Sequence, residues 1–313
     1  MSFSSNWLAL REPADRAARD GALAAALGDW AAARTRALGR PLLVVDLGCG
    51  TGASHRALSP LLPGARWRLT DNDPALLAEA AGRTGAHTLC LDLAATPEIA
   101  LDGADIVTAS ALFDLASAAW IDRLAGALAP GAAMLAALSY DGIETWDPAD
   151  PAEAEGLAAF HAHQVGDKGF GPSLGPGGAA YLAQALARGG REVRRAPSPW
   201  RLSRPRDGAL IEALAEGAAG AAAQAAHANG AAAQTTGADG AAAQATGADG
   251  AAAQTTGADG GGTQAAHTNG GGAQFSAAAE PMSPQVHARW AAARRAAETV
   301  VIGHEDVLAL PRG

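Results

Sequence analysis

Short apolar segments alternate with longer, helix-like segments through the first half of the chain. Five of the apolar segments have the length and composition of strands, and they lie at residues 43–47, 66–70, 87–91, 104–110 and 133–140. Helical segments separate them, such as the one that begins at Asp73 and Pro74, where Asp73 suits the N-cap and Pro74 the first helical position. This alternation predicts an α/β fold with a doubly wound parallel sheet and helices on both of its faces.

The first predicted strand runs directly into a glycine-rich turn, which reads D-L-G-C-G-T-G over residues 46–52. Glycines at alternate positions remove the side chains that would keep a ligand away from the backbone. They also allow the positive φ angles that a tight strand-to-helix turn requires. Such a turn suits a nucleotide-like cofactor, although a glycine turn of this kind also occurs for structural reasons alone.

Polar residues follow the predicted strands at the points where the strands end. These residues are Asp46, Asp71, Asp92 and Ser110. In open α/β sheets ligands bind outside the carboxyl ends of the strands, so the four side chains are expected at one site. Asp71 lies 23 residues after Gly48, near the spacing of about 20 for an acid that binds ribose hydroxyls. A solvated turn acid is the alternative interpretation of Asp71.

The glycine turn matches the pattern [DE]-x-G-x-G-x-G at every fixed position, and with its flanking strands it resembles the class I (Rossmann-like) S-adenosylmethionine (SAM) methyltransferases over about residues 40–140. The resemblance implies a mostly parallel sheet of seven strands with an antiparallel last strand, and segments 192–202 and 299–310 could supply the last two. It also implies SAM as the cofactor, with the acid after the second strand on the ribose and the acid after the third on the adenine amine. The cofactor-binding residues that it indicates are Asp46, Gly48, Cys49, Gly50, Gly52, Asp71, Asn72, Asp92, Leu93 and Ser110.

The activity expected from this resemblance is SAM-dependent methyl transfer to a small-molecule O- or N-acceptor that the sequence does not identify. Because the sulfonium of SAM already carries a good leaving group, alignment and exclusion of water suffice and a strong base is not required. Two alternatives stay open. One is an NAD(P)-dependent oxidoreductase, since Gly48, Gly50 and Ala53 also fit the dinucleotide pattern G-x-G-x-x-A. The other is a catalytically silent SAM-binding module.

Two segments, one before the predicted core and one within it, could close such a site. Residues 141–178 read as a lid on the acceptor side, and residues 1–40 as a helical cap with a helix over about 14–38. His161 and His163 in the lid are candidates for a general base, as is Asp114, although a position on a surface loop is the favoured interpretation of either histidine alone. The i, i+2 spacing of the histidines does not suit a metal site, and no metal is expected. Trp7 and Arg11 of the cap could close the site, with Arg11 on the SAM carboxylate, or could simply pack on the surface.

A ten-residue unit, G-A-A-A-Q-x-x-G-A-D with variants, repeats from Gly220 to Gln274. The repeat contains no Leu, Ile, Val or aromatic residue with which to build a core, and its glycines recur too often for a stable isolated helix. We therefore expect a disordered insertion over residues 220–274. It interrupts a SAM-binding core over residues 41–219, which residues 275–313 complete with a helix at 284–298 and the final strand.

Charge, the length of apolar segments and cysteine content limit the partners and the cellular location that we expect. The chain has a formal net charge of -9, and no Lys or Arg occurs between Arg206 and Arg289, so a nucleic-acid partner is not expected. No segment reaches the roughly 18 consecutive apolar residues of a membrane helix. Two cysteines, without a disulfide framework, are typical of a cytoplasmic protein. No stable protein partner is inferred.

Overall fold

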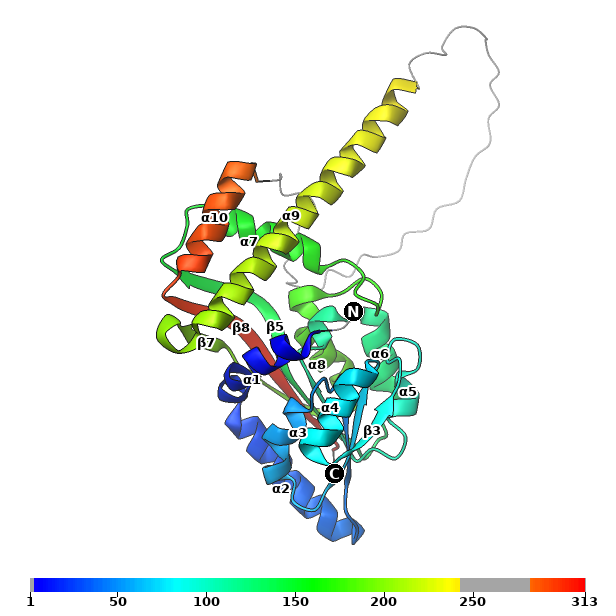
Figure 1. The fold of residues 1–313 in the computed structure, drawn as a ribbon. Helices are drawn as coiled ribbons and strands as arrows, with labels where there is room; N and C mark the ends of the chain where they lie inside the picture. Colours follow the sequence, from blue (N-terminus) through cyan, green and yellow to red (C-terminus); the bar gives the residue numbers. More distant parts are fainter. Residues whose placement is uncertain (1–2, 243–281, 313) are drawn as a thin grey trace, which may run out of the picture.

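The computed structural model describes residues 3–242 and 282–312, and its centre is an eight-stranded sheet of order β3-β2-β1-β4-β5-β8-β6, with β7 also paired to β8 (Figure 1). The strands are β1 (Leu43–Leu47), β2 (Arg66–Asp71), β3 (His87–Cys90), β4 (Ile106–Ser110), β5 (Ala133–Asp147), β6 (Glu192–Pro197), β7 (Trp200–Ser203) and β8 (Thr299–Leu310). Neighbours among β1 to β5 run parallel, whereas β8 is antiparallel to β5, β6 and β7. The predicted fold class, a mostly parallel doubly wound sheet with an antiparallel last strand, is confirmed.

Helices cover both faces of this sheet. They are α1 (Ser5–Ala18), α2 (Gly21–Leu38), α3 (Ala53–Leu58), α4 (Pro74–Thr84), α5 (Pro97–Ala100), α6 (Ala118–Ala127), α7 (Glu153–Gln164), α8 (Gly178–Arg188), α9 (Arg204–Ala242) and α10 (Pro284–Ala296). Successive residues of β1 face opposite layers, because side chains alternate along a strand. Val44 packs in the core formed with α2 and α4, and Val45 packs in the core formed with α6 and α8. None of the helices in the described part of the chain is both long and apolar enough to cross a membrane.

Two predicted elements are each divided in the structure. The helix predicted over residues 14–38 is the end of α1 followed by α2, because Asp20 caps the second helix by accepting a hydrogen bond from the Leu23 N–H (2.7 Å). The strand predicted over residues 192–202 is β6 followed by β7. At this break the Ser198 N–H donates to the His304 carbonyl (2.8 Å), and the next residue, Pro199, has no N–H to donate. The sheet therefore has eight strands instead of seven.

A third layer, formed by α7, α9 and α10, lies beyond the long β5–β8 pair (Figure 1). Its centre is Arg294 of α10, which is 1% exposed and lies over the rings of Trp146 and Trp290, 4.4 Å from each centroid. The guanidinium also pairs with Glu144 of β5 (2.9 Å) and with Glu153 of α7. A buried arginine is costly unless it is paired, and here two carboxylates and two aromatic faces surround it.

The α9 helix continues past Gly220, where the sequence predicted the disordered insertion to begin. Ala218 and Ala222 lie one helical turn apart and pack with Trp290 and Ala291 of α10. The predicted boundary is therefore wrong for residues 220–224, because these small side chains allow α9 to lie directly against a tryptophan. Of the rest of the predicted insertion, the backbone of residues 225–242 continues α9, and residues 243–274 lie outside the described residues.

One buried carboxylate joins β8 to three other parts of the molecule. Asp306 is 2% exposed, and its Oδ2 accepts a hydrogen bond from the Asp20 N–H (2.9 Å) at the α1–α2 junction. Its Oδ1 accepts from the Leu138 N–H (2.8 Å) and from the Ser198 hydroxyl (2.6 Å). Leu138 has a φ of 58°, within a bulge of β5, so this unusual backbone conformation is held by a charge-assisted hydrogen bond.

We expect Asp306→Ala to lower the free energy of unfolding by about 3 kcal/mol or more, since it leaves three buried donors without an acceptor. Asp306→Asn keeps one acceptor oxygen and should lose less. Asp102→Ala, which removes an exposed carboxylate, should change stability by less than about 0.5 kcal/mol. Chemical denaturation monitored by circular dichroism measures all three. A loss below about 1 kcal/mol for Asp306→Ala would contradict this account.

Candidate functional site

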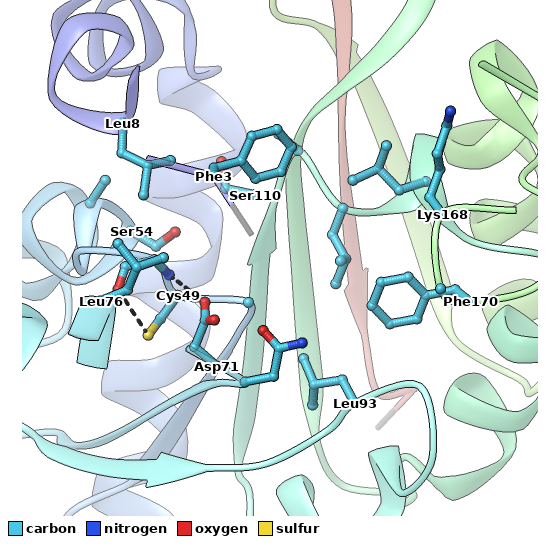
Figure 2. Close-up of a pocket in the computed structure, with 18 of the residues that line it drawn as sticks. Phe3, Leu8, Cys49, Ser54, Asp71, Leu76, Leu93, Ser110, Lys168 and Phe170 are labelled. Carbon is cyan, nitrogen blue, oxygen red and sulfur yellow. Dashed lines mark hydrogen bonds between the residues drawn. The ribbon is translucent and has the colours of Figure 1, made fainter. Parts of the chain in front are cut away.

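A pocket with a cavity volume of about 170 Å³ opens at the carboxyl ends of β1 to β4 (Figure 2). It is lined by the following residues of the predicted site: Gly48, Cys49, Gly50, Asp71, Asn72, Asp92, Leu93 and Ser110. These residues come from four loops that are separated in the sequence, and the parallel sheet brings them to one edge. Asp46 and Gly52, which were predicted with them, do not line the pocket.

The glycine turn has the backbone conformation that its sequence requires. Gly48, Gly50 and Gly52 have φ angles of 62°, 52° and 84°, values that other residues adopt only with strain. The turn is held to β2 by a hydrogen bond from the Cys49 N–H to the Thr70 carbonyl (2.9 Å). A Cβ on Gly50 would lie 2.8 Å from Leu8 Cδ1, so α1 packs directly on this turn. Gly52 is the N-cap of α3 and shapes the turn from outside the pocket.

Asp71 connects the end of β2 to the glycine turn. Its Oδ2 accepts a hydrogen bond from the Gly50 N–H (2.9 Å), and its Oδ1 accepts from the Asp73 N–H (3.1 Å). A carboxylate has about four acceptor positions, so two of them are left for a ligand in the pocket. Asp73 caps α4 through the Ala75 and Leu76 N–H groups, which is the structural role predicted for it.

Asp46 is fully buried beneath the pocket and ties β1 to β4. Its Oδ1 accepts a hydrogen bond from the Thr108 hydroxyl (2.7 Å), and Thr108 is its partner in the register of the two strands. Burial raises the pKa of Asp46 to about 6, against the opposing effects of the Thr108 hydrogen bond and the nearby positive charge of Arg19. The side chain thus holds the ends of β1 and β4 together from beneath the residues that line the pocket.

Asp92, Leu93 and Ser110 form the remaining predicted part of the wall. Asp92 is exposed, and its Oδ1 accepts from the Ala94 N–H (2.9 Å), which fixes the loop after β3. Leu93 is buried, and its carbonyl accepts from the indole N–H of Trp120 (2.8 Å). The Ser110 hydroxyl accepts from Arg19 Nη2 (3.1 Å), which joins the end of β4 to the end of α1.

The pocket is also lined by Leu8, Arg11 and Asp15 of α1, together with Phe3 just before the helix. Of these, the sequence indicated only Arg11. Their spacing of three and four residues places 8, 11 and 15 on one helical face, and this periodicity was the available signal. Trp7, the other residue predicted to close the site, instead packs with the core cluster around Trp200.

On the opposite side the pocket is bordered by Lys168, Gly169 and Phe170, which follow α7. Figure 2 shows Lys168 and Phe170 on the side of the cavity away from Asp71. The Phe170 ring packs edge-on against Trp120, with 5.0 Å between the centroids. Part of the segment predicted as a lid therefore does contact the cavity.

The two histidines predicted in the lid lie on α7 and do not line the pocket. His161 is 8% exposed, and its Nε2 lies 2.9 Å from the Tyr140 hydroxyl. Because that hydroxyl donates to Glu144 Oε1 (2.9 Å), His161 is assigned as the donor in the other hydrogen bond. His163 Nε2 lies 3.0 Å from Gln224 Oε1 of α9. Burial lowers the pKa of both histidines. Each of them contacts a neighbouring element of the fold: His161 contacts β5, and His163 contacts α9.

Asp114 follows β4 in a short turn of 3₁₀ helix, Phe113–Leu115, between pocket residues Leu112 and Leu115. Its Oδ1 is buried and has no hydrogen-bond partner among the described residues. Burial raises the pKa of Asp114 to about 6, although backbone groups and the charge of Arg11 act in the opposite direction. Within residues 3–242 and 282–312, no group of three or more His, Cys, Asp or Glu side chains could hold a metal ion.

No family model and no curated protein sequence matches this chain. Among solved structures it is similar to a putative methyltransferase in complex with the Haloferax volcanii Trm112 methyltransferase activator, with 22% identity and a TM-score of 0.36 over 50% of this chain and 64% of that one. It is also similar to an O-methyltransferase family protein from Burkholderia thailandensis, with 16% identity and a TM-score of 0.36 over 50% of this chain and 48% of that one.

A third similar structure is magnesium protoporphyrin IX methyltransferase from Synechocystis PCC 6803 with bound SAM. It is 17% identical, with a TM-score of 0.34 over 56% of this chain and 71% of that one. This chain spans less than two thirds of the first two structures. The similarity to these structures concerns the fold, and the function is argued from the residues of the pocket.

The raised pKa of Asp114 leads to a pH-dependent effect on stability. An acid whose pKa is higher in the folded state than in the unfolded state stabilises the fold below about pH 4 and loses that contribution as the pH rises through 6. We therefore expect Asp114→Asn to become more stable, relative to the natural protein, by about 1 to 3 kcal/mol between pH 4 and pH 7.5. Denaturation at several pH values measures this. The exposed-site control Asp102→Asn should give no such trend, and a flat difference for Asp114→Asn would show that its carboxyl titrates normally.

Proposed function

We propose that this protein is a SAM-dependent methyltransferase that acts on a small-molecule O- or N-acceptor. The observation that carries the proposal is the convergence of a glycine turn and two strand-end carboxylates, Asp71 and Asp92, in one pocket at the carboxyl edge of parallel strands. Gly50 lines the cavity, and a side chain there would collide with Leu8, which lines the same cavity from α1. The residues present therefore fit an adenosyl ligand.

The order of the strands suggests how such a ligand would lie. Asp71 at the end of β2 has acceptor positions for the two ribose hydroxyls, and Asp92 after β3 has one for the adenine amine. Leu93 supplies an apolar surface beside them. The sulfonium end would then lie toward β1 and β4, near Gly48 and Ser110. When bound, SAM supplies an activated methyl group with a good leaving group.

The protein residues would align the acceptor with this methyl group and exclude water. Phe3 and Leu8 cover the pocket from α1, and Phe170 borders it on the other side. Asp114 does not itself line the pocket, but it lies between the lining residues Leu112 and Leu115. It is the candidate to accept a proton from an acceptor hydroxyl or amine, because its buried Oδ1 has no described partner and its pKa of about 6 allows both protonation states near neutral pH. His161 and His163 are engaged elsewhere and are weaker candidates.

The class of the acceptor and the cellular location are also part of the proposal. A small acceptor is proposed because the net charge of -9 disfavours nucleic acid. Cys49 and Cys90 are both free thiols, which supports a reducing, cytoplasmic location. One of the similar structures is a complex with a methyltransferase activator. Whether this protein also binds a partner protein is therefore a question to test on the purified protein.

Calorimetric titration of the natural protein with SAM, S-adenosylhomocysteine and NAD tests the cofactor. We expect micromolar binding of both adenosyl ligands and none of NAD, because Gly52 and the acid two residues before the first glycine favour SAM over a dinucleotide. Binding of NAD alone would replace the proposal with the oxidoreductase alternative. Release of S-adenosylhomocysteine in the presence of small hydroxyl and amine acceptors then separates an enzyme from a silent SAM-binding module.

Substitution of Asp71 tests the ribose site. Asp71→Ala should weaken binding of S-adenosylhomocysteine by about 10- to 100-fold, because it removes a charged acceptor and frees the Gly50 N–H. Asp71→Asn keeps an acceptor for that N–H and should lose less. Asp29→Ala, on the exposed side of α2, is the control and should bind like the natural protein. Unchanged affinity in Asp71→Ala would make Asp71 a turn acid only.

A further inference from the structure

The charged residues that line the pocket differ in whether they have a partner in the protein. Arg11 Nε donates to Asp15 Oδ2 (3.0 Å), so these two opposite charges form an ion pair on α1. Asp71 and Asp92 accept from backbone N–H groups and are the acids assigned above to the adenosyl ligand. Lys168 is the remaining charged residue of the lining, and it forms no ion pair with any described residue.

Lys168 is held beside the last turn of α7. Its Nζ donates to the His163 carbonyl (3.0 Å). An ammonium group has three donors, so two of them are left for another acceptor. The neighbouring Asp167 directs its Oδ1 to the N–H groups of the two glycines that follow (2.7 and 3.0 Å). Figure 2 shows the Lys168 side chain extended away from Asp71, so its charge is remote from the ribose site proposed above.

The segment that carries Lys168 packs against the turn that carries Asp114. The Leu174 N–H donates to the Ala116 carbonyl (2.9 Å), directly after that turn. Phe170 lies between these contacts and adds an apolar ring to the pocket wall. The candidate base and the unpaired lysine therefore belong to adjoining segments, with an apolar surface beside them.

We propose that the methyl acceptor carries a carboxylate, separate from the hydroxyl or amine that is methylated, and that Lys168 binds this carboxylate through its remaining donors. This inference rests on the proposed function, which places the adenosyl ligand over the ends of β1 to β4 and leaves the side of Lys168 for the acceptor. A phosphate monoester fits less well, because it carries nearly two negative charges. Carboxylates already outnumber cations among the described lining residues. Phe170 would pack on the apolar body of the acceptor.

The competing explanation is that Lys168 only caps the end of α7 through the His163 carbonyl. A cap would influence every acceptor equally, whereas a binding lysine would influence only acceptors that carry a carboxylate. A panel of hydroxybenzoic, aminobenzoic, hydroxycinnamic and aliphatic hydroxy acids, each beside its carboxamide, separates these effects. The carboxamide keeps the shape of the acid and removes its charge. Release of S-adenosylhomocysteine measures turnover, and mass spectrometry identifies the methylated group.

Four variants complete the experiment. Lys168→Gln removes the charge but keeps a donor for the α7 carbonyl, and Lys168→Arg keeps the charge. Ser173→Ala is the matched control for the shape of the segment, because it removes the hydroxyl that donates to the Gln164 carbonyl (2.7 Å) without changing a charge. Arg36→Gln removes an exposed positive charge on α2 and controls for net charge.

We expect turnover of at least one acid, with a kcat/KM for its carboxamide lower by about 10-fold or more. Lys168→Gln should raise the KM of the acid by about 10- to 100-fold, because it removes a charge-assisted hydrogen bond, and should change kcat by less than about threefold. The KM of the carboxamide should change by less than about twofold. Lys168→Arg should retain most of the preference for the acid. Ser173→Ala should affect acid and carboxamide by the same factor, and Arg36→Gln should affect neither.

Equal effects of Lys168→Gln on acid and carboxamide would overturn this inference and leave Lys168 as a helix cap. A methyl ester as the product would also overturn it, because the carboxylate would then be the methylated group. So would the absence of turnover with every acid by a protein that binds S-adenosylhomocysteine. Calorimetry should show that Lys168→Gln binds S-adenosylhomocysteine like the natural protein, and weaker binding would place Lys168 at the cofactor instead. Failure of the natural protein to bind S-adenosylhomocysteine would overturn the proposed function, and this inference with it.

Discussion

The hydrogen bonds to the Asp306 carboxylate are the interaction on which the architecture of this protein most depends. They join β8 to the α1–α2 junction, to the bulge of β5 and to the connection between β6 and β7. Without an acceptor at this point, three donors would lose their partners. The strain of the positive φ of Leu138 would then no longer be offset by a hydrogen bond to a carboxylate. One carboxylate therefore sets both the path of the last strand and the point at which the N-terminal segment turns from α1 into α2.

A line of alternating charges extends from Asp306 toward the pocket. Arg19 lies between Asp306, Asp46 and Asp15, whose negative charges oppose the lowering of its pKa by burial. The same guanidinium binds Ser110 at the end of β4. The three carboxylates are buried and Arg19 is half-buried, so the opposite charges limit the cost of desolvation. The position of α1 over the pocket is therefore fixed by electrostatics as well as by the packing of Leu8 on the glycine turn.

The elements that local sequence specifies were predicted well. The glycine turn, the N-cap at Asp73 and strands such as 299–310 depend on residues a few positions apart, and the structure agrees with them. Contacts between distant residues could not be predicted in the same way. Nothing near Asp46 in the sequence reveals that Thr108 accompanies it beneath the pocket, and nothing near His161 reveals Tyr140. The role of Asp15 also depends on Trp200, 185 residues away.

Those distant contacts matter to the site because the residues that line the pocket and the residues that hold its wall lie in different parts of the chain. Every described residue that lines the pocket lies between Phe3 and Phe170. Yet the wall formed by α1 is held from outside that range, by Trp200 of β7 through Asp15 and by Asp306 of β8 through Asp20. The described elements from β7 onward thus hold the wall of the pocket without lining it themselves. A change near Trp200 or Asp306 would move α1 first, and any effect on binding would follow from the displacement of Leu8, Arg11 and Asp15.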